Sequence, residues 1–157
     1  MRSLEYSMLY ETLFTFFQHH ATHKEVKRPM SITPKVLIVE DSTTSSLFMS
    51  QALRKAGYQV ITAVDGNEGL AKAVKERPHC LVLDVVLPGV SGFGVCRQLR
   101  AMDPNHNLSI IMISSKNSQM DQSWGLRQGA DRYLPKPFTE EVLLQTIEEV
   151  LMEHYRA

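Results

Sequence analysis

Residues 79–85 read HCLVLDV, an apolar run with an aspartate near its end. A run of this length and composition is typical of a strand that is buried on both faces of a parallel sheet. Similar runs occur at 35–40 (KVLIVE) and at 108–114 (LSIIMIS). We therefore predict that these three segments are strands of one sheet.

The segments around these runs continue an alternation of strands and helices. Further strands are predicted at 58–63 and 132–134, and helices at 42–56, 65–76, 91–102, 118–128 and 139–154. Gly57 and Gly129 follow two of the helices as stop signals. The inner faces are predicted to carry Leu70, Ala73 and Val74 on the second helix, and Val142, Leu143, Ile147, Val150 and Leu151 on the last.

Five strand–helix repeats indicate a doubly wound α/β fold, in which helices cover both faces of a parallel sheet. Ligands of such sheets bind at the carboxyl ends of the strands. The residues that follow each strand are therefore the first candidates for a functional site.

The composition excludes several other classes of protein. Among the 157 residues, 17 acidic side chains balance 17 basic ones, which argues against bulk binding to DNA or to anionic lipid. No apolar stretch reaches the roughly 20 residues of a membrane span, and the N-terminus lacks the pattern of a signal peptide. Cys80 and Cys96 form no CxxC motif, and we expect both to pack as small apolar side chains in a cytoplasmic protein.

Acidic side chains follow two of the predicted strands. Glu40 and Asp41 end the first strand, and Asp84 ends the third. If the sheet is wound as predicted, these carboxylates converge, and their repulsion would favour a bound cation. Mg²⁺ suits a site that has few carboxylates and keeps several waters.

Two further polar residues complete the set. Ser114 ends the fourth strand, and Lys136 follows the fifth. Taken singly, such an aspartate is usually a turn residue and such a lysine a solvated surface group. Their joint placement at successive strand ends favours a phosphoryl-transfer site instead, with Asp84 as the nucleophile and Lys136 offsetting charge on the phosphoryl oxygens.

These residues closely resemble the response-regulator receiver family, the CheY-like proteins. The resemblance is carried by Val39-Glu40-Asp41-Ser42, by Asp84 with Leu87-Pro88-Gly89 and Gly92, by Ser114-Ser115, by Gly129-Ala130-Asp131 and by Lys136-Pro137-Phe138. It implies a flavodoxin-like sheet with strand order 2-1-3-4-5 and a receiver domain over residues 34–155. Glu40, where many members have Asp, and Ser114, where Thr is commoner, are variants within the family.

The resemblance also assigns roles by position. Asp84 would be the phosphoacceptor, and Mg²⁺ would be held by Glu40, Asp41, Asp84 and the backbone carbonyl of Val86. Ser114 and Lys136 would bind the phosphoryl group, Tyr133 would swing inward when Ser114 moves, and the Lys136–Pro137 bond would be cis. Val86 and Lys116 would tune dephosphorylation, and because an apolar Val86 cannot hold a water, we expect slow autodephosphorylation.

The segment from Ser123 to Ala130 (SWGLRQGA) is similar to the PilH-like branch of stand-alone regulators, which act in twitching motility and phototaxis. Trp124 in this segment is either a partly buried packing residue or part of a partner surface.

The resemblance implies that a sensor histidine kinase or a phosphotransfer domain is the phosphodonor. The chain ends near the close of the last predicted helix, so we expect no output domain and signalling through protein contacts, as a monomer or a phosphorylation-dependent dimer. Two alternatives within signalling are a phosphorelay intermediate and a phosphorylation-independent interaction domain. A metal-dependent phosphohydrolase is a further alternative, but the sequence offers no extra general acid–base beside Asp84.

Residues 1–33 lie outside the resemblance. Leu13, Phe16 and Phe17 have helical spacing within this stretch. The extension is therefore a mistranslated upstream stretch with the true start at Met30, a helix that packs on the domain or a partner, or a largely disordered segment.

Overall fold

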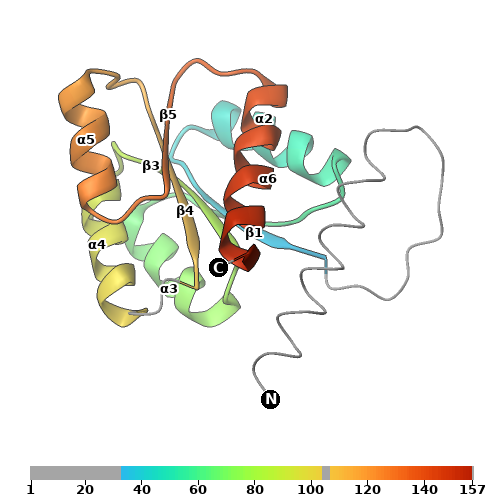
Figure 1. Ribbon diagram of the computed structural model, residues 1–157, viewed down its shortest axis with the longest axis horizontal. Coiled ribbons are helices and arrows are strands. Elements are labelled where there is room, and N and C mark those ends of the chain that lie inside the picture. Colours follow the sequence, from blue (N-terminus) through green and yellow to red (C-terminus); the bar gives the residue numbers. More distant parts are fainter. Residues whose placement is uncertain (1–32, 104–106, 157) are drawn as a thin grey trace.

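The computed structural model describes residues 33–103 and 107–156, which alternate between strands and helices throughout. Figure 1 shows the elements in chain order. They are β1 (Lys35–Val39), α2 (Thr43–Lys55), β2 (Gln59–Ala63), α3 (Gly66–Glu76), β3 (Cys80–Asp84), α4 (Gly92–Met102), β4 (Ser109–Ser114), α5 (Gln119–Arg127), β5 (Arg132–Pro135) and α6 (Glu140–Arg156).

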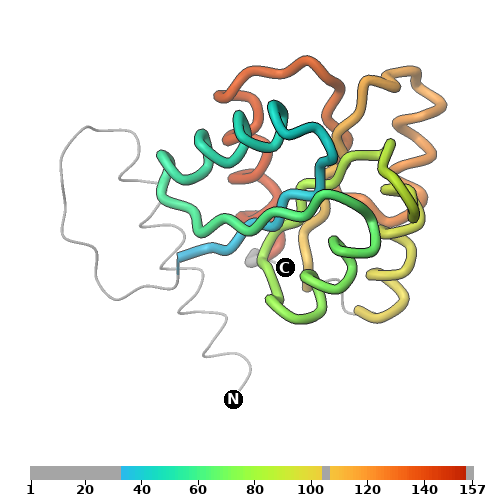
Figure 2. Tube along the Cα trace, turned by 180° about the vertical axis from the view of Figure 1, so that it is seen from behind, coloured from blue at the N-terminus to red at the C-terminus, as the bar shows by residue number. Residues whose placement is uncertain are grey.

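All five strands pair in parallel, in the order β2-β1-β3-β4-β5, so the predicted fold class and strand order are confirmed. The helices form a layer on each side of the sheet, with α6 in front in Figure 1 and α3 and α4 toward the viewer in Figure 2. Parallel strands require such crossovers, and the crossovers place every strand's carboxyl end at the same edge of the sheet.

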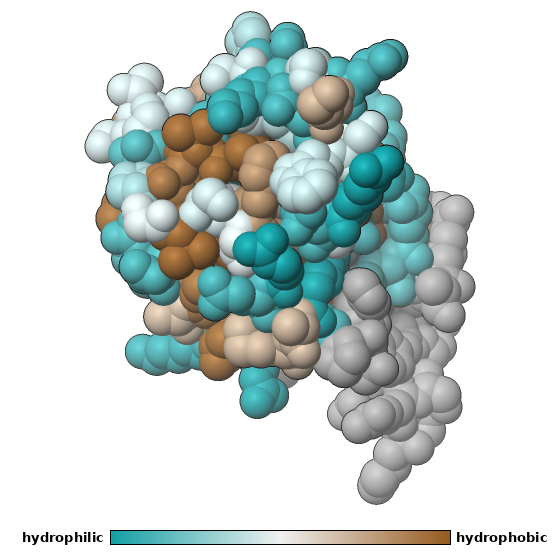
Figure 3. Space-filling model, turned by 90° about the vertical axis from the view of Figure 1, so that its left-hand side faces the viewer, coloured by the Kyte–Doolittle hydropathy of each residue, from teal (hydrophilic) through white to brown (hydrophobic). Residues whose placement is uncertain are grey.

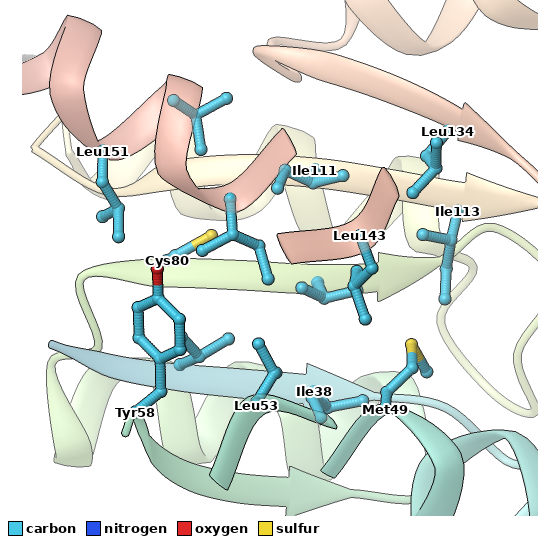
Figure 4. Close-up of a cluster of buried hydrophobic side chains, with 14 residues drawn as sticks. Ile38, Met49, Leu53, Tyr58, Cys80, Ile111, Ile113, Leu134, Leu143 and Leu151 are labelled. Atoms are coloured by element: carbon cyan, nitrogen blue, oxygen red, sulfur yellow. The ribbon is translucent and has the colours of Figure 1, made fainter. Parts of the chain in front are cut away.

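Two apolar clusters hold the layers together, one on each face of the sheet. In Figure 4, Met49 and Leu53 of α2 and Leu143 of α6 point toward Ile38 of β1. The three central strands are fully buried along their described lengths, apart from Lys35 at the start of β1, as expected for a sheet covered on both faces. Within the described residues, no helix combines the length and apolar character needed to cross a bilayer.

The helix starts are set by capping side chains. Ser42, Asp65, Ser91 and Ser118 are extended residues whose side chains accept a hydrogen bond from the backbone N–H three residues later. Each satisfies an N–H that the first turn leaves without a partner. The predicted helices began at these four residues, so each observed helix starts one residue later because its cap is not itself helical.

The predicted inner face of α3 was partly wrong. Val74 is 57% exposed, and the buried side of α3 consists of Gly66, Gly69 and Ala73. A Cβ at Gly69 would lie 2.8 Å from a methyl carbon of Val39. The helix therefore approaches β1 through small residues, which leaves the larger Val74 outside the contact.

The predicted stripe on α6 also needs one correction. Four of the five predicted residues are buried: Leu143, Ile147, Val150 and Leu151. Val142 is 41% exposed because it lies beside the helix stripe that these four residues form. Cys80 and Cys96 are buried free thiols, as predicted. Burial raises the pKa of both thiols, that of Cys96 to about 11, which disfavours the reactive thiolate.

His79 joins the starts of β1 and β3. Its Nδ1 accepts a hydrogen bond from the backbone N–H of Lys35 at 2.9 Å, and its backbone N–H donates to the Lys35 carbonyl at 2.8 Å. An Nδ1 atom that accepts cannot carry a proton. Burial, followed by the positive charge of Lys35, lowers the pKa of His79 below its ordinary value.

We expect His79 to make the fold sensitive to mild acid. Because its pKa is lower in the folded than in the unfolded chain, the unfolded chain takes up the proton first as the pH falls, and stability drops below about pH 6.5. His79→Asn keeps an acceptor for Lys35 but does not titrate. The free energy of unfolding, measured with urea at about pH 7.5 and at about pH 5.5, should decrease less between these two pH values for this variant than for the wild type.

His79→Leu provides the control for this prediction. It removes both the titratable group and the hydrogen-bond acceptor, so it should be less stable than His79→Asn at both pH values. Its free energy of unfolding should decrease as little between the two pH values as that of His79→Asn. If the free energy of unfolding of His79→Asn decreased between the two pH values as much as that of the wild type, this would contradict the role given to His79.

Candidate functional site

Three carboxylates meet at the carboxyl edge of the sheet. Glu40 and Asp41 directly follow β1, and Asp84 is the last residue of β3, the neighbouring strand. One carboxylate oxygen from each residue lies within 4.8 Å of the others. Glu40 and Asp84 are only 2% and 6% exposed, whereas Asp41 faces solvent. The structure thus brings together the acidic residues that the sequence placed at separate strand ends.

Lys136 lies between the two buried carboxylates. Its Nζ atom is 2.6 Å from Glu40 Oε2 and 2.7 Å from Asp84 Oδ2. Lys136 directly follows β5, its backbone N–H donates to the Ser114 carbonyl at 2.8 Å, and its bond to Pro137 is cis, as the resemblance implied.

Backbone N–H groups hold the other oxygen of each buried carboxylate. Ser42 N donates to Glu40 Oε1 at 3.0 Å, and Val86 N donates to Asp84 Oδ1 at 3.0 Å. Each carboxylate is therefore held by one backbone group and by Lys136. These bonds fix the orientation of both side chains, because charge-assisted bonds to a carboxylate are strong and directional.

The pocket carries an excess of negative charge. Burial raises the pKa of Glu40, and the negative charge of Asp84 adds to this, while bonds from Lys136 and Ser42 oppose it. Burial alone would lower the pKa of Lys136, but its bonds to Asp84 and Glu40 and their charges outweigh burial, so its pKa is raised. One ammonium cannot balance three carboxylates.

The donor set fits a hard cation. All three side chains offer oxygen atoms, and the partly open position of Asp41 leaves one side of the cluster accessible to solvent. Oxygen donors and accessible water are what Mg²⁺ requires, and its charge would offset the repulsion between the carboxylates. The acidic cluster is therefore compatible with Mg²⁺.

Gly92 fixes the distance between this cluster and α4. A Cβ at this position would lie 2.1 Å from the Asp84 carbonyl oxygen, and Gly92 N donates to the Val85 carbonyl at 2.9 Å. The start of α4 therefore presses directly on the backbone that carries Asp84. The sequence marked Gly92 as part of a motif, but this close approach becomes visible only in the structure.

Ser114, Lys116 and Tyr133 form a chain of contacts beside the acidic cluster. Ser114 is fully buried, and its Oγ atom accepts a bond from Lys116 N at 3.0 Å. The Tyr133 hydroxyl donates to the Lys116 carbonyl at 2.5 Å. Burial, the largest of several effects, raises the pKa of Tyr133, so the hydroxyl keeps its proton and can donate.

Two of the site residues predicted from the sequence, Val86 and Trp124, lie at the surface. The Val86 side chain is 54% exposed, next to the N–H that holds Asp84. Trp124 is 48% exposed on α5, together with Met120 and Leu126, and does not join the acidic cluster. Figure 3 views the side on which α4 and α5 lie and shows apolar residues gathered there. This partial exposure is compatible with both interpretations of Trp124.

One aromatic contact near the site has no signal in the sequence. Phe48 of α2 and Phe138, which follows β5, have ring centroids 6.4 Å apart. Phe48 is 42% exposed. Because the two residues are far apart in the sequence, no local pattern could have paired them.

Known proteins are similar to this chain in sequence and in fold. The model of the response regulator receiver domain family matches residues 36–148. Protein PilH of Pseudomonas aeruginosa is 41% identical over 117 residues, which cover 74% of this chain and 97% of that protein.

Two solved structures are similar to the whole receiver region. Chemotaxis protein CheY4 of Vibrio cholerae is 37% identical with a TM-score of 0.72, over 76% of this chain and 99% of that one. A chain from the CheX–CheY–BeF3–Mg²⁺ complex of Borrelia burgdorferi is 26% identical with a TM-score of 0.73, over 80% and 94%. The strand order, the acidic cluster with its lysine and these matches together show that the chain belongs to the response regulator receiver domain family, as a CheY-like member of the PilH type.

Proposed function

We propose that Asp84 is the residue through which this receiver accepts a phosphoryl group. A CheY-like receiver of the PilH type is a phosphoacceptor switch in two-component signalling. The observation that carries the assignment to Asp84 is its position: it is buried at the end of the central strand β3, and Lys136 and Val86 N hold its two oxygens.

The transfer follows from this geometry. A carboxylate oxygen of Asp84 attacks the phosphorus in line, the P–N bond of a donor phosphohistidine breaks as the new O–P bond forms, and the electron pair returns to the imidazole. Lys136 offsets the charge on the phosphoryl oxygens. Mg²⁺, when held by Glu40, Asp41, Asp84 and the Val86 carbonyl, would supply the remaining positive charge. The similar chain from Borrelia burgdorferi was solved in a complex with Mg²⁺, which supports this choice of ion.

The signal would then pass through Ser114. Its hydroxyl lies on the strand next to Asp84 and now accepts a bond from Lys116 N. A phosphoryl group on Asp84 offers oxygens that can accept a hydrogen bond from this hydroxyl and draw it toward Asp84. Movement of Ser114 would alter the loop at Lys116, to which Tyr133 is bonded, and so bias a two-state element on this side of the molecule.

The phosphodonor is proposed to be a sensor histidine kinase or a phosphotransfer domain. Exposed apolar side chains also lie in the segments that follow β1, β2 and β3, the strands whose carboxyl ends lie at the same edge as the acidic cluster, where a protein donor would have to dock. They belong to the first half of α2 and to the residues just after β2 and β3: Leu47, Phe48, Val64 and Val86. Exposed apolar side chains at the same edge as a charged cluster suit a protein donor better than a small, highly charged one.

We further propose that residues 34–155 form the receiver unit and that it works in the cytoplasm, where such kinases act and where Cys80 and Cys96 would stay reduced. It would catalyse only its own phosphorylation and dephosphorylation and signal by protein contact rather than by binding DNA, with Trp124 in the contact surface, as a monomer or a phosphorylation-dependent dimer. A role in motility or taxis is supported by the likeness to PilH and to the chemotaxis protein CheY4.

Acetyl phosphate with Mg²⁺ distinguishes the candidate functions. A stable acyl phosphate on Asp84 is expected for a switch. Rapid turnover of many phosphoesters would instead indicate a phosphohydrolase, and an absence of reaction would indicate a phosphorylation-independent interaction domain. Transfer of the phosphoryl group from the labelled protein to an added phosphotransfer domain would indicate a relay intermediate.

Asp84→Asn should abolish this labelling and leave the protein folded. The substitution is nearly isosteric and lowers the repulsion in a cluster that has excess negative charge. Incorporation from radiolabelled acetyl phosphate and the circular dichroism spectrum measure the two effects. Asp121→Asn, the same change on α5, is the control and should label normally. If Asp84→Asn were still labelled, a residue other than Asp84 would be the phosphoacceptor.

Millimolar Mg²⁺ should raise the melting temperature. A tenfold excess over the dissociation constant adds about 1.4 kcal/mol of stability, or roughly 5 °C for a domain of this size. Sodium chloride of equal ionic strength separates binding from screening. Asp41→Asn removes an exposed ligand and should reduce the shift. Equal shifts with both salts would argue against a specific cation site.

The phosphorylated protein should lose its phosphoryl group slowly, over minutes or longer. The exposed Val86 side chain cannot hold a water by a hydrogen bond. Val86→Asn introduces a polar group at this position and should shorten the lifetime, whereas Val64→Asn, the same change at the exposed valine that follows β2, should not. Decay of the acyl phosphate after removal of the donor measures the lifetime. A wild-type lifetime of seconds would contradict the prediction.

A further inference from the structure

Gly125 is the one buried residue of α5. Its φ is not positive, so no turn or left-handed conformation requires glycine here. Glycine within a helix costs about 1 kcal/mol relative to alanine. The cost has a structural reason: a Cβ at this position would lie 2.7 Å from Cδ2 of the Tyr133 ring and 3.0 Å from Sδ of Met112. The ring of Tyr133 therefore rests directly on the backbone of α5.

The Tyr133 ring has little freedom to move away from a side chain at this position. Its hydroxyl is held by the Lys116 carbonyl at 2.5 Å, and the Lys116 N–H is bonded to the Ser114 hydroxyl. Met112 is flexible and could adjust, but a planar ring that is held at its far end could not. On the outer side of α5, the two neighbours of Gly125 in the sequence, Trp124 and Leu126, are both about half exposed.

We propose that Gly125 is the positioning residue for Tyr133 and that the contact between the Tyr133 ring and the backbone of Gly125 passes the phosphorylation signal to α5. The inference rests on the proposed function, because the signal begins with phosphoryl transfer to Asp84. When Ser114 moves, Lys116 moves because its backbone N–H is bonded to the Ser114 hydroxyl. The Tyr133 hydroxyl is bonded to the Lys116 carbonyl, so the ring moves as well and its contact with the backbone of α5 changes. The exposed side chains of Met120, Trp124 and Leu126 then change their positions together with the helix.

Hydrogen exchange of the α5 amides tests this path. Exchange is measured with and without acetyl phosphate and Mg²⁺, and phosphorylation of Asp84 is followed in parallel by intact mass. In the wild type, phosphorylation should change the exchange rates of α5 several-fold. In Gly125→Ala, Asp84 should still be phosphorylated, but the change in α5 should be lost because the ring no longer lies in its place against the helix.

Ser123→Ala is the matched control. Ser123 is exposed on the same helix, and its change to alanine also raises helix propensity, so the variant should respond to phosphorylation as the wild type does. Trp124 is the only tryptophan of the chain, so its fluorescence offers a second measure of the change in α5.

A double-mutant cycle keeps the inference testable if Gly125→Ala folds poorly. With Tyr133 present, Gly125→Ala should lower the urea midpoint, because the new methyl group overlaps the ring. In a Tyr133→Ala background the same change should raise the midpoint, because the ring is gone, the flexible Met112 side chain can adjust to the methyl group, and the gain in helix propensity remains. A structural role that does not involve Tyr133 would give the same sign in both backgrounds and would overturn the assignment.

The remaining outcomes distinguish a failure of the proposed function from a failure of this inference. A wild-type chain that is never labelled overturns the proposed function and this inference with it. A labelled wild type whose α5 exchange is unchanged overturns the inference alone, as does a labelled Gly125→Ala variant that responds like the wild type.

Discussion

The two hydrogen bonds of the Lys136 ammonium group, to Glu40 and to Asp84, are the interaction on which the site depends. Both carboxylates are almost completely buried, and the ammonium group supplies the opposite charge that makes burial of negative charge less costly. Glu40 follows β1, Asp84 ends β3 and Lys136 follows β5, so their contact also ties the centre of the sheet to its edge strand. The remaining negative charge, which includes that of Asp41, makes the cluster suitable for a cation and for phosphoryl chemistry.

Close approaches at three glycines surround this centre. Gly92 places α4 on the backbone of Asp84, Gly66 places α3 on the Val90 carbonyl, and Gly125 places α5 on the ring of Tyr133. In each case a side chain would overlap atoms that cannot easily move. Such contacts leave little free space between the groups, because protein interiors are close-packed. A small shift beside Asp84 would therefore reach the neighbouring helices instead of being absorbed on the way.

Much of the fold could be predicted because its signals are local. Apolar runs such as 79–85 mark buried strands, and capping residues such as Ser42 mark helix starts to within one residue. The errors concern helix faces. Val74 was predicted inside and lies outside, because α3 packs through Gly66, Gly69 and Ala73. Apolar periodicity gives most weight to large side chains, whereas a helix that lies close to a sheet needs small ones.

The sequence by itself determined the alternation of strands and helices and the polar residue types that follow each strand. It could nominate Glu40, Asp84 and Lys136 because parallel strands place their carboxyl ends at one edge. Only the tertiary structure decided that Lys136 binds both carboxylates, that Tyr133 bonds to Lys116, and that its ring rests on Gly125. These contacts join residues that are distant in the chain, and their distances depend on how the whole sheet twists and packs, which no local pattern of side chains encodes.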